Sequence, residues 1–147
     1  MGLSDKRVLV LVLIILLSRA AGLQAHWVED GVAVCTDLSS QSNPVIARDG
    51  MGGAFIAWID QRNGNADIYA QRLSVSGTPV WTSGGVAVCT DPSYLSYVQI
   101  CPDGAGGAII TWVDGRNGNN DIYAQRIGPN GTPRWTVDGI AVCLEAS

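Results

Sequence analysis

Short apolar runs separated by turn residues recur along the chain. In the first cycle they cover residues 31–35, 45–48, 54–59 and 67–72. Each run has the length and composition of a β-strand. The pairs Asp49-Gly50 and Asn63-Gly64 stand between runs and favour tight turns, because these residues tolerate left-handed backbone angles. The third run is apolar at odd and even positions alike, so we expect its strand to be covered on both faces.

The whole pattern repeats with a period of 54 residues. Residues 27–80 align with residues 81–134 without a gap, and 32 of the 54 positions are identical. A third copy begins at residue 135 and stops at residue 147. A fixed period of this size indicates a repeat architecture, in which each unit buries its apolar surface against the next.

The repeat predicts an all-β fold. Four strands in about 40 to 55 residues is the spacing of a β-propeller blade, a four-stranded antiparallel sheet. We therefore predict β-propeller blades for residues 26–147, as an incomplete ring of two blades plus an extra strand. The alternative is a β-sandwich, which explains neither the strict period nor the burial of one strand on both faces.

The first 25 residues are predicted to be a secretory signal peptide. Lys6 and Arg7 precede an apolar run at residues 8–17, and small residues follow. Ten apolar residues span about 15 Å as a helix, half of the roughly 30 Å of a bilayer core. We expect cleavage near residue 25 and no membrane span afterwards. The mature chain would then be exported, to the extracellular space or the cell envelope (periplasm or outer surface).

Charge narrows the classes of partner. The 122 residues after residue 25 hold six Arg, no Lys and twelve acidic residues, a formal charge of -6. A chain of this charge repels phosphate backbones, so we expect no nucleic-acid partner.

Two of the motifs resemble the repeats of secreted bacterial β-propellers. Asp49-Gly50, an apolar strand, a short polar turn and an Asp-Ile-Tyr strand follow in the order of the TolB-type repeat. Residues 58–72 are also similar to the Trp-x-Asp-x-Arg and Asp-Ile-Tyr-Ala-Gln-Arg repeats of large exported proteins that are often sialidase-like in fold. The resemblance covers residues 27–147 and implies the propeller architecture, but it does not specify an activity.

The sialidase-like resemblance implies an alternative function, that of a fragment of a glycoside hydrolase. Residues 74–81 stand where that family has its Asp-box. The box aspartate is absent, however: Ser76 in the first unit and Asn130 in the second stand near its place. The family also needs three convergent arginines and a Tyr paired with Glu. After the leader the only glutamates are Glu29 and Glu145. The repeat arginines need not converge, because they recur with the unit; they are Arg62, Arg72, Arg116 and Arg126. We therefore expect a non-enzymatic module.

One acidic loop per unit is a candidate calcium site, because it concentrates the oxygen ligands that calcium prefers. The candidate ligands are Asp60, Asn63, Asn65 and Asp67, with Asp114, Asn117, Asn119 and Asp121. An arginine inside each loop, Arg62 or Arg116, would repel the metal. The favoured interpretation is therefore a hairpin in which the aspartates bind this arginine or backbone amides, with no cofactor.

Aromatic residues divide into those that repeat and those that do not. Tryptophans recur with the period and are expected to pack between units, although exposed ones could stack on sugar rings; they are Trp27, Trp81 and Trp135, and Trp58 and Trp112. Tyr94 and Tyr97 instead replace Ser40 and Asn43. Packing would have accepted the common residue, so we expect these tyrosines in a loop between units, as a binding surface for a glycan or a protein.

The four cysteines allow disulfides in an exported chain, but their spacing argues against most pairings. Cys35, Cys89 and Cys143 are equivalent, and equivalent Cα atoms on adjacent sheets lie about 10 Å apart, beyond the reach of a bridge of about 7 Å. We expect buried thiols, with one irregular bridge to Cys101 left open. The single histidine, His26, stands at the predicted mature N-terminus, so we expect neither a Ser/His/Asp triad nor most kinds of zinc site.

Two units do not close a propeller, which needs about four to eight blades. We expect the exposed faces to be covered by the remaining blades of a longer chain or by other copies, and we favour the longer chain. The function predicted from the sequence is an exported, non-enzymatic repeat module that binds a glycan or protein at the cell surface.

Overall fold

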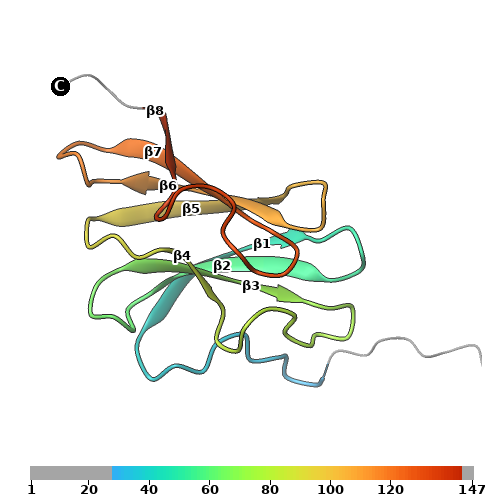
Figure 1. Cartoon of the computed structure of the whole chain (residues 1–147). Coiled ribbons are helices and arrows are strands. Elements are labelled where there is room, and N and C mark those ends of the chain that lie inside the picture. Colours follow the sequence, from blue (N-terminus) through green and yellow to red (C-terminus); the bar gives the residue numbers. More distant parts are fainter. Residues whose placement is uncertain (1–27, 144–147) are drawn as a thin grey trace, which may run out of the picture.

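The computed structural model describes residues 28–143, which form eight strands and no helix (Figure 1). The strands are β1 (Gln41–Arg48), β2 (Ala54–Asp60), β3 (Asp67–Leu73), β4 (Val86–Cys89), β5 (Leu95–Pro102), β6 (Ala108–Asp114), β7 (Asp121–Ile127) and β8 (Ile140–Cys143). The predicted signal peptide, Trp27 and Glu145 lie outside the described residues. Within residues 28–143 no helix is long and apolar enough to cross a membrane.

The strands form two four-stranded sheets, and every pairing is antiparallel. The first sheet has the order β1-β2-β3-β4 and the second the order β5-β6-β7-β8, so each sheet is a meander of consecutive strands. The registers repeat with the period of the sequence: Trp58 pairs with Tyr69 in the first sheet, and Trp112 pairs with Tyr123 in the second. The predicted all-β class is confirmed.

The prediction of a strand at residues 31–35 is wrong. Its copy at Val86–Cys89 is β4, which pairs with β3 of the preceding unit, and Ile140–Cys143 pairs with β7 in the same way. Each sheet therefore consists of three strands of one unit and the first strand of the next. Residues 31–35 lack a strand to pair with within the described chain, and an unpaired strand leaves its backbone groups without hydrogen bonds.

The Asp-Gly turn forms as its residue types indicate. Gly50 has a φ of 77°, and the Asp49 carboxylate accepts hydrogen bonds from the backbone N–H groups of Met51 and Gly53, both at 2.8 Å. A Cβ atom at Gly53 would lie 2.1 Å from the carbonyl oxygen of Leu73. The close approach of the β1–β2 turn to the end of β3 therefore requires glycine at this position.

The two sheets lie against each other, and they meet through opposite faces. Each sheet has two faces, which we call front and back. The front face carries Phe55, Ala57 and Ile59 in the first sheet and Ile109, Thr111 and Val113 in the second. The back face carries Ile56, Trp58 and Asp60 in the first sheet and Ile110, Trp112 and Asp114 in the second. The core between the sheets joins the front face of the first sheet to the back face of the second. Figure 1 shows the resulting layers, with β5 of the second sheet beside β1 of the first.

Burial along the central strands follows from this stacking. In β2 six of seven residues are buried, whereas in β6 buried and half-buried residues alternate. The second sheet covers the front face of the first, but none of the eight strands covers the front face of the second. The expected burial on both faces is thus realised in β2 alone.

Candidate functional site

A buried aspartate anchors the end of the central strand in each sheet. The Asp60 carboxylate, fully buried, accepts hydrogen bonds from Trp58 Nε1 at 2.8 Å and from Arg62 Nε and Nη2 at 2.9 and 2.6 Å. The Arg62 guanidinium also lies 3.8 Å from the centre of the Tyr69 ring and donates to the Gly84 carbonyl. This cluster therefore ties the β2–β3 loop to the segment that leads into β4.

The electrostatics of this cluster favour a permanently charged pair. Burial raises the pKa of Asp60, but the hydrogen bonds from Arg62 and Trp58 outweigh it and lower the pKa to about 2. The Asp60 carboxylate raises the pKa of Arg62 in turn. Asp114 and Arg116 repeat the arrangement, with a distance of 2.6 Å from Arg116 Nη2 to Asp114 Oδ2. The aspartate and the arginine of each pair are therefore both charged at neutral pH.

The second arginine of each unit is paired as well. Arg72 Nη2 lies 2.8 Å from Asp49 Oδ2, and Arg126 Nε lies 2.8 Å from Asp103 Oδ2. Burial raises the pKa of Asp49, whereas hydrogen bonds from Met51, Arg72 and Gly53 lower it, and the net effect is a lowered pKa. All four repeat arginines thus bind a carboxylate of their own sheet.

The calcium candidates are divided between two kinds of contact. Asp60 and Asp114 bind the loop arginines, as the hairpin interpretation expects. In the second unit Asp121 accepts hydrogen bonds from the amide nitrogens of Asn117 and Asn119, at 2.9 and 2.8 Å. Asn63 and Asn65 donate to Asp67 in the same way. Within residues 28–143 no three His, Cys, Asp or Glu side chains are grouped so that they could hold a metal ion.

The repeated tryptophans pack between or within the sheets. Trp58 and Trp112 are buried, and their indole N–H groups donate to Asp60 and Asp114. Trp81 is 5% exposed, stacks on Phe55 with ring centroids 5.7 Å apart and donates to the Pro129 carbonyl of the second unit. Packing between units is confirmed for Trp81 and Trp112, whereas Trp58 packs on Tyr69 of its own sheet and Trp135 is half-buried.

The cysteines are free thiols in different environments. Cys89 is buried, and burial raises its pKa to about 12. Cys35 is half-buried, and Cys101 and Cys143 are exposed. The expectation of buried thiols is therefore right for Cys89 and wrong for Cys101 and Cys143, and the bridge to Cys101 is not formed. Cys101 pairs with Ile109 on the front face of the second sheet, and no third sheet among residues 28–143 covers Cys143.

Tyr94 and Tyr97 are exposed, as expected of a binding surface, at 64% and 78%. Tyr94 lies in the loop between the sheets, but Tyr97 lies within β5, so the prediction of a loop position is wrong for Tyr97. Tyr97 stands where the pairing of β5 with β6 shifts register between Ser96 and Gln99, and its φ is 51°. The equivalent Asn43 in β1 has the same φ.

Both tyrosines border an open hollow of about 500 Å³ between the two sheets. Residues of β1 and β5 line it together: Asn43, Pro44, Val45, Tyr94, Ser96, Tyr97 and Val98. None of these side chains is charged. The Ser96 hydroxyl is buried and has no hydrogen-bond partner among the described residues. Sequence reasoning did not identify Asn43 and Ser96, because their proximity depends on how the two sheets stack.

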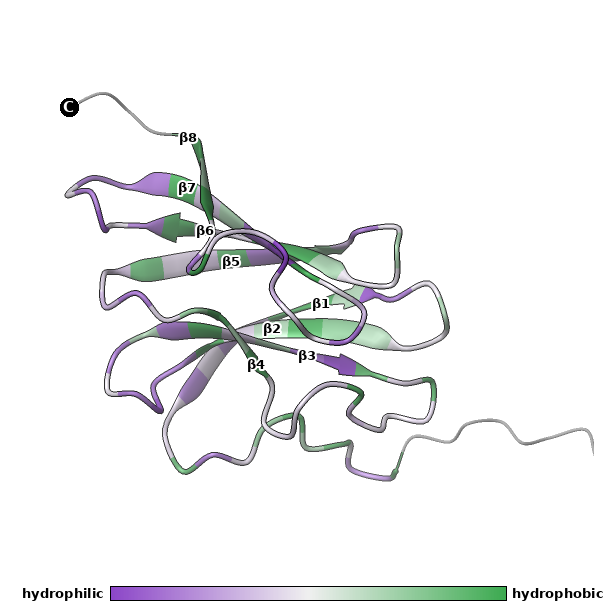
Figure 2. Cartoon of the chain, viewed as in Figure 1, coloured by the Kyte–Doolittle hydropathy of each residue, from purple (hydrophilic) through white to green (hydrophobic). Residues whose placement is uncertain are grey.

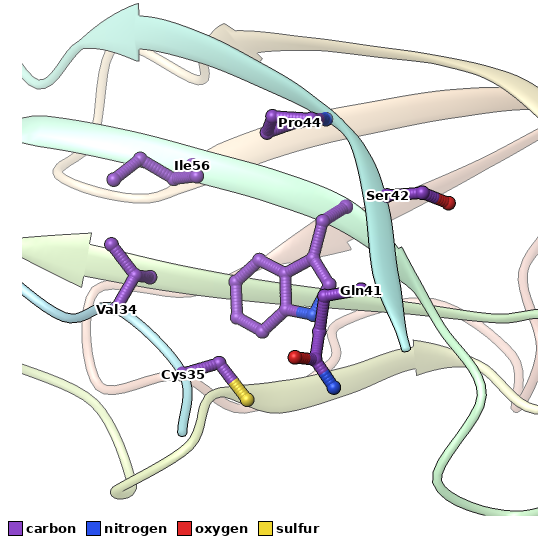
Figure 3. A pocket seen from close by; sticks show the side chains of 7 residues that line it. Val34, Cys35, Gln41, Ser42, Pro44 and Ile56 are labelled. Atoms are coloured by element: carbon purple, nitrogen blue, oxygen red, sulfur yellow. The ribbon is translucent and has the colours of Figure 1, made fainter. Parts of the chain in front are cut away.

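A second hollow, of about 190 Å³, lies behind the first sheet. The N-terminal segment contributes Val34 and Cys35, β1 contributes Gln41, Ser42 and Pro44, and β2 contributes Ile56 and Trp58 (Figure 3). The lining is mostly apolar and holds no charged group. It borders the part of the back face of the first sheet that residues 31–35 leave uncovered.

No protein-family model, curated protein or solved structure matches this chain.

Proposed function

We propose that this chain is an exported, non-enzymatic β-propeller repeat module that binds a glycan through the surface around Tyr94 and Tyr97. The observation that carries the proposal is Tyr97, an exposed aromatic residue in a left-handed backbone conformation beside a second exposed tyrosine. The proposed location is the outside of the cell or its envelope, in keeping with the signal-like sequence of residues 1–25.

The propeller component is supported by the way the sheets stack. In a sandwich of two equivalent sheets, the same face of both sheets would pack together, front on front or back on back. Here a front face packs on a back face, and successive sheets are meanders with the same strand order. Stacking of this kind can continue from unit to unit, which is the geometry of propeller blades.

Backbone strain supports a role for Tyr97 beyond packing. A residue with a Cβ atom in the left-handed region costs about 1–2 kcal/mol, whereas asparagine tolerates this conformation. The first unit has Asn43 at this position and the second has Tyr97. With 78% of its surface exposed, Tyr97 gains little from burial to offset the cost. The fold imposes this conformation at both positions but does not require a tyrosine there, and residues in strained conformations are typical of binding sites.

The chemistry of the hollow fits a neutral, hydroxyl-rich ligand. Two exposed tyrosine rings present flat apolar faces with polar tips, the features that stack on a sugar ring. Asn43 and the two tyrosine hydroxyls supply hydrogen-bonding groups. Because the lining carries no charge, a carbohydrate fits it better than a charged peptide does.

The alternative, a fragment of a sialidase-like hydrolase, has less support. Its chemistry needs arginines that converge on the substrate carboxylate, and each of the four repeat arginines binds an aspartate of its own sheet. Hydrolysis of an aryl sialoside by the purified protein would favour this alternative.

A glycan array with the purified mature chain tests the proposal. The matched variant is the double substitution Tyr94→Ser and Tyr97→Asn, which restores the residues of the first unit at both positions. We expect the wild type to bind and the variant to lose at least tenfold in affinity while remaining folded. Equal binding by both proteins, or no glycan bound by the wild type, would refute the glycan proposal. Capture of a protein partner that the variant fails to capture would replace the glycan by that protein.

A further inference from the structure

The front face of the second sheet is an exposed apolar surface. The equivalent face of the first sheet is buried in the hydrophobic core between the sheets. At equivalent positions Ile68 is fully buried and Ile122 is 38% exposed, while Val88 is 3% exposed and Val142 is 62% exposed. Phe55 is fully buried, whereas Ile109 is half-buried. The difference arises because the second sheet covers the first, and the described chain offers nothing equivalent to cover the second. Figure 2 shows β8 as an apolar strand at this open end.

The back face of the first sheet is the matching surface. With the exception of Leu73, which stands where the second sheet has Ile127, its residues in β2 and β3 are those that the second sheet presents to the first: Ala54 and Ala108, Ile56 and Ile110, Trp58 and Trp112, Asp60 and Asp114, Tyr69 and Tyr123, Gln71 and Gln125. Ile110 is fully buried in the contact between the sheets, whereas Ile56 is half-buried and borders the hollow of about 190 Å³. The uncovered parts of these two faces, at Ile122 and Val142 and at Ile56, are therefore counterparts of surfaces that pack on each other inside the chain.

Residues 31–35 already lie where the outer strand of a preceding sheet would lie. Cys35 Sγ is 3.2 Å from Arg62 Nη2, and its counterpart Cys89 in β4 is 3.5 Å from Arg116 Nη2. The N-terminal segment therefore keeps the position of a β4-like strand on the back face, although the other strands of such a sheet are missing from the described chain. The hollow of about 190 Å³ lies between this segment, β1 and β2 (Figure 3).

We propose that copies of this chain associate head to tail, with the front face of the second sheet of one copy packed on the back face of the first sheet of the next. The occupant is a second copy because the equivalents of these two surfaces pack on each other inside the chain. The contact is heterologous, so it forms a ring if the rotation closes and a filament if it does not. It does not involve Tyr94 and Tyr97, which border the hollow between the two sheets of one copy.

One consequence concerns the outer strand of the second sheet. In the assembly, residues 31–35 of one copy and β8 of its neighbour would compete for the same place beside β7. Their sequences are interchangeable: the segments 31–35 and 139–143 differ only by Val32 and Ile140. One of the two segments therefore occupies that place beside β7, in the register that Ala87 and Tyr69 show in the first sheet.

Variants that block one face each test the association. Ile122→Arg places a charge on the front face, and Ile56→Arg places one on the back face; Gln41→Arg repeats the second test, since its counterpart Leu95 is 3% exposed. Size-exclusion chromatography with light scattering should give a mass above that of a monomer for the wild type, rising with concentration. Each variant alone should be a monomer with the circular dichroism of the wild type.

Mixing decides between a head-to-tail contact and other modes. The Ile122→Arg and Ile56→Arg variants together retain one intact front face and one intact back face, so an equimolar mixture should form a dimer and nothing larger. A wild type that is monomeric at every concentration would overturn the proposal. So would dimers of Ile56→Arg alone, which would show that two front faces pair with each other. The Tyr94→Ser, Tyr97→Asn variant should assemble like the wild type, which separates this result from glycan binding.

Discussion

The isoleucine of the Asp-Ile-Tyr-Ala-Gln-Arg strand provides a matched test of how the sheets are covered. Ile68 and Ile122 have the same neighbours in sequence and the same place in their sheets, but Ile68 is fully buried and Ile122 is 38% exposed. Truncation of each to alanine removes the same three carbon atoms. Any difference in the free energy of unfolding must then come from the tertiary environment.

The expected cost is larger at Ile68. Loss of three buried carbons at about 0.8 kcal/mol each gives about 2.4 kcal/mol, and the cavity raises the total to about 3–4 kcal/mol. At Ile122 the side chain is only partly buried, so the loss of transfer free energy falls to about 1.5 kcal/mol. Because the site is open to solvent, the truncation leaves no enclosed cavity there. We therefore expect Ile68→Ala to destabilise the protein by about 2 kcal/mol more than Ile122→Ala.

Urea unfolding followed by tryptophan fluorescence measures both values. The experiment is run at a dilution where light scattering gives a monomer, so that self-association does not bury Ile122. The slope of the free energy against urea should be the same for both variants, so the midpoint alone reports stability. Equal losses at the two positions would refute the reasoning, because they would mean that the second sheet does not shield the front face of the first.

Three further predictions follow from individual groups. The pKa of Asp60 is about 2 in the folded protein, below the value of about 3.9 in the unfolded chain. The ionised Asp60 carboxylate therefore adds to the free energy of unfolding above pH 4, and this stabilisation is lost as the pH falls toward 2. Urea midpoints should drop over that interval, and Asp60→Asn should flatten the drop. Tyr97→Asn should raise stability by about 1 kcal/mol, because asparagine tolerates a φ of 51°, and a lower melting temperature would contradict this. A maleimide should label Cys101 rapidly in the native protein but Cys89 only after unfolding, because Cys89 is buried with a pKa of about 12; equal labelling rates would show that the sheets separate.

Features that depend on neighbours along the chain follow from the sequence itself. The 54-residue period, the strands at residues 54–59 and 67–72 and the turn at Asp49-Gly50 all form as predicted. So does the pairing of Asp60 with Arg62, two residues apart. Each rests on strand alternation, turn propensity or a short loop, and these act over a few residues. The period also specifies that the two sheets have the same order and register.

Other features depend on what lies beside a segment in space. Residues 31–35 and Val86–Cys89 are nearly identical in sequence, yet only the second segment is a strand, because only it has β3 to pair with. Likewise the environment of Tyr97, and its proximity to Asn43, arise from a register shift in β5 and from the stacking of β5 on β1. Burial and strand pairing are relations between distant segments, so identical sequences acquire different roles according to whether a neighbouring sheet is present.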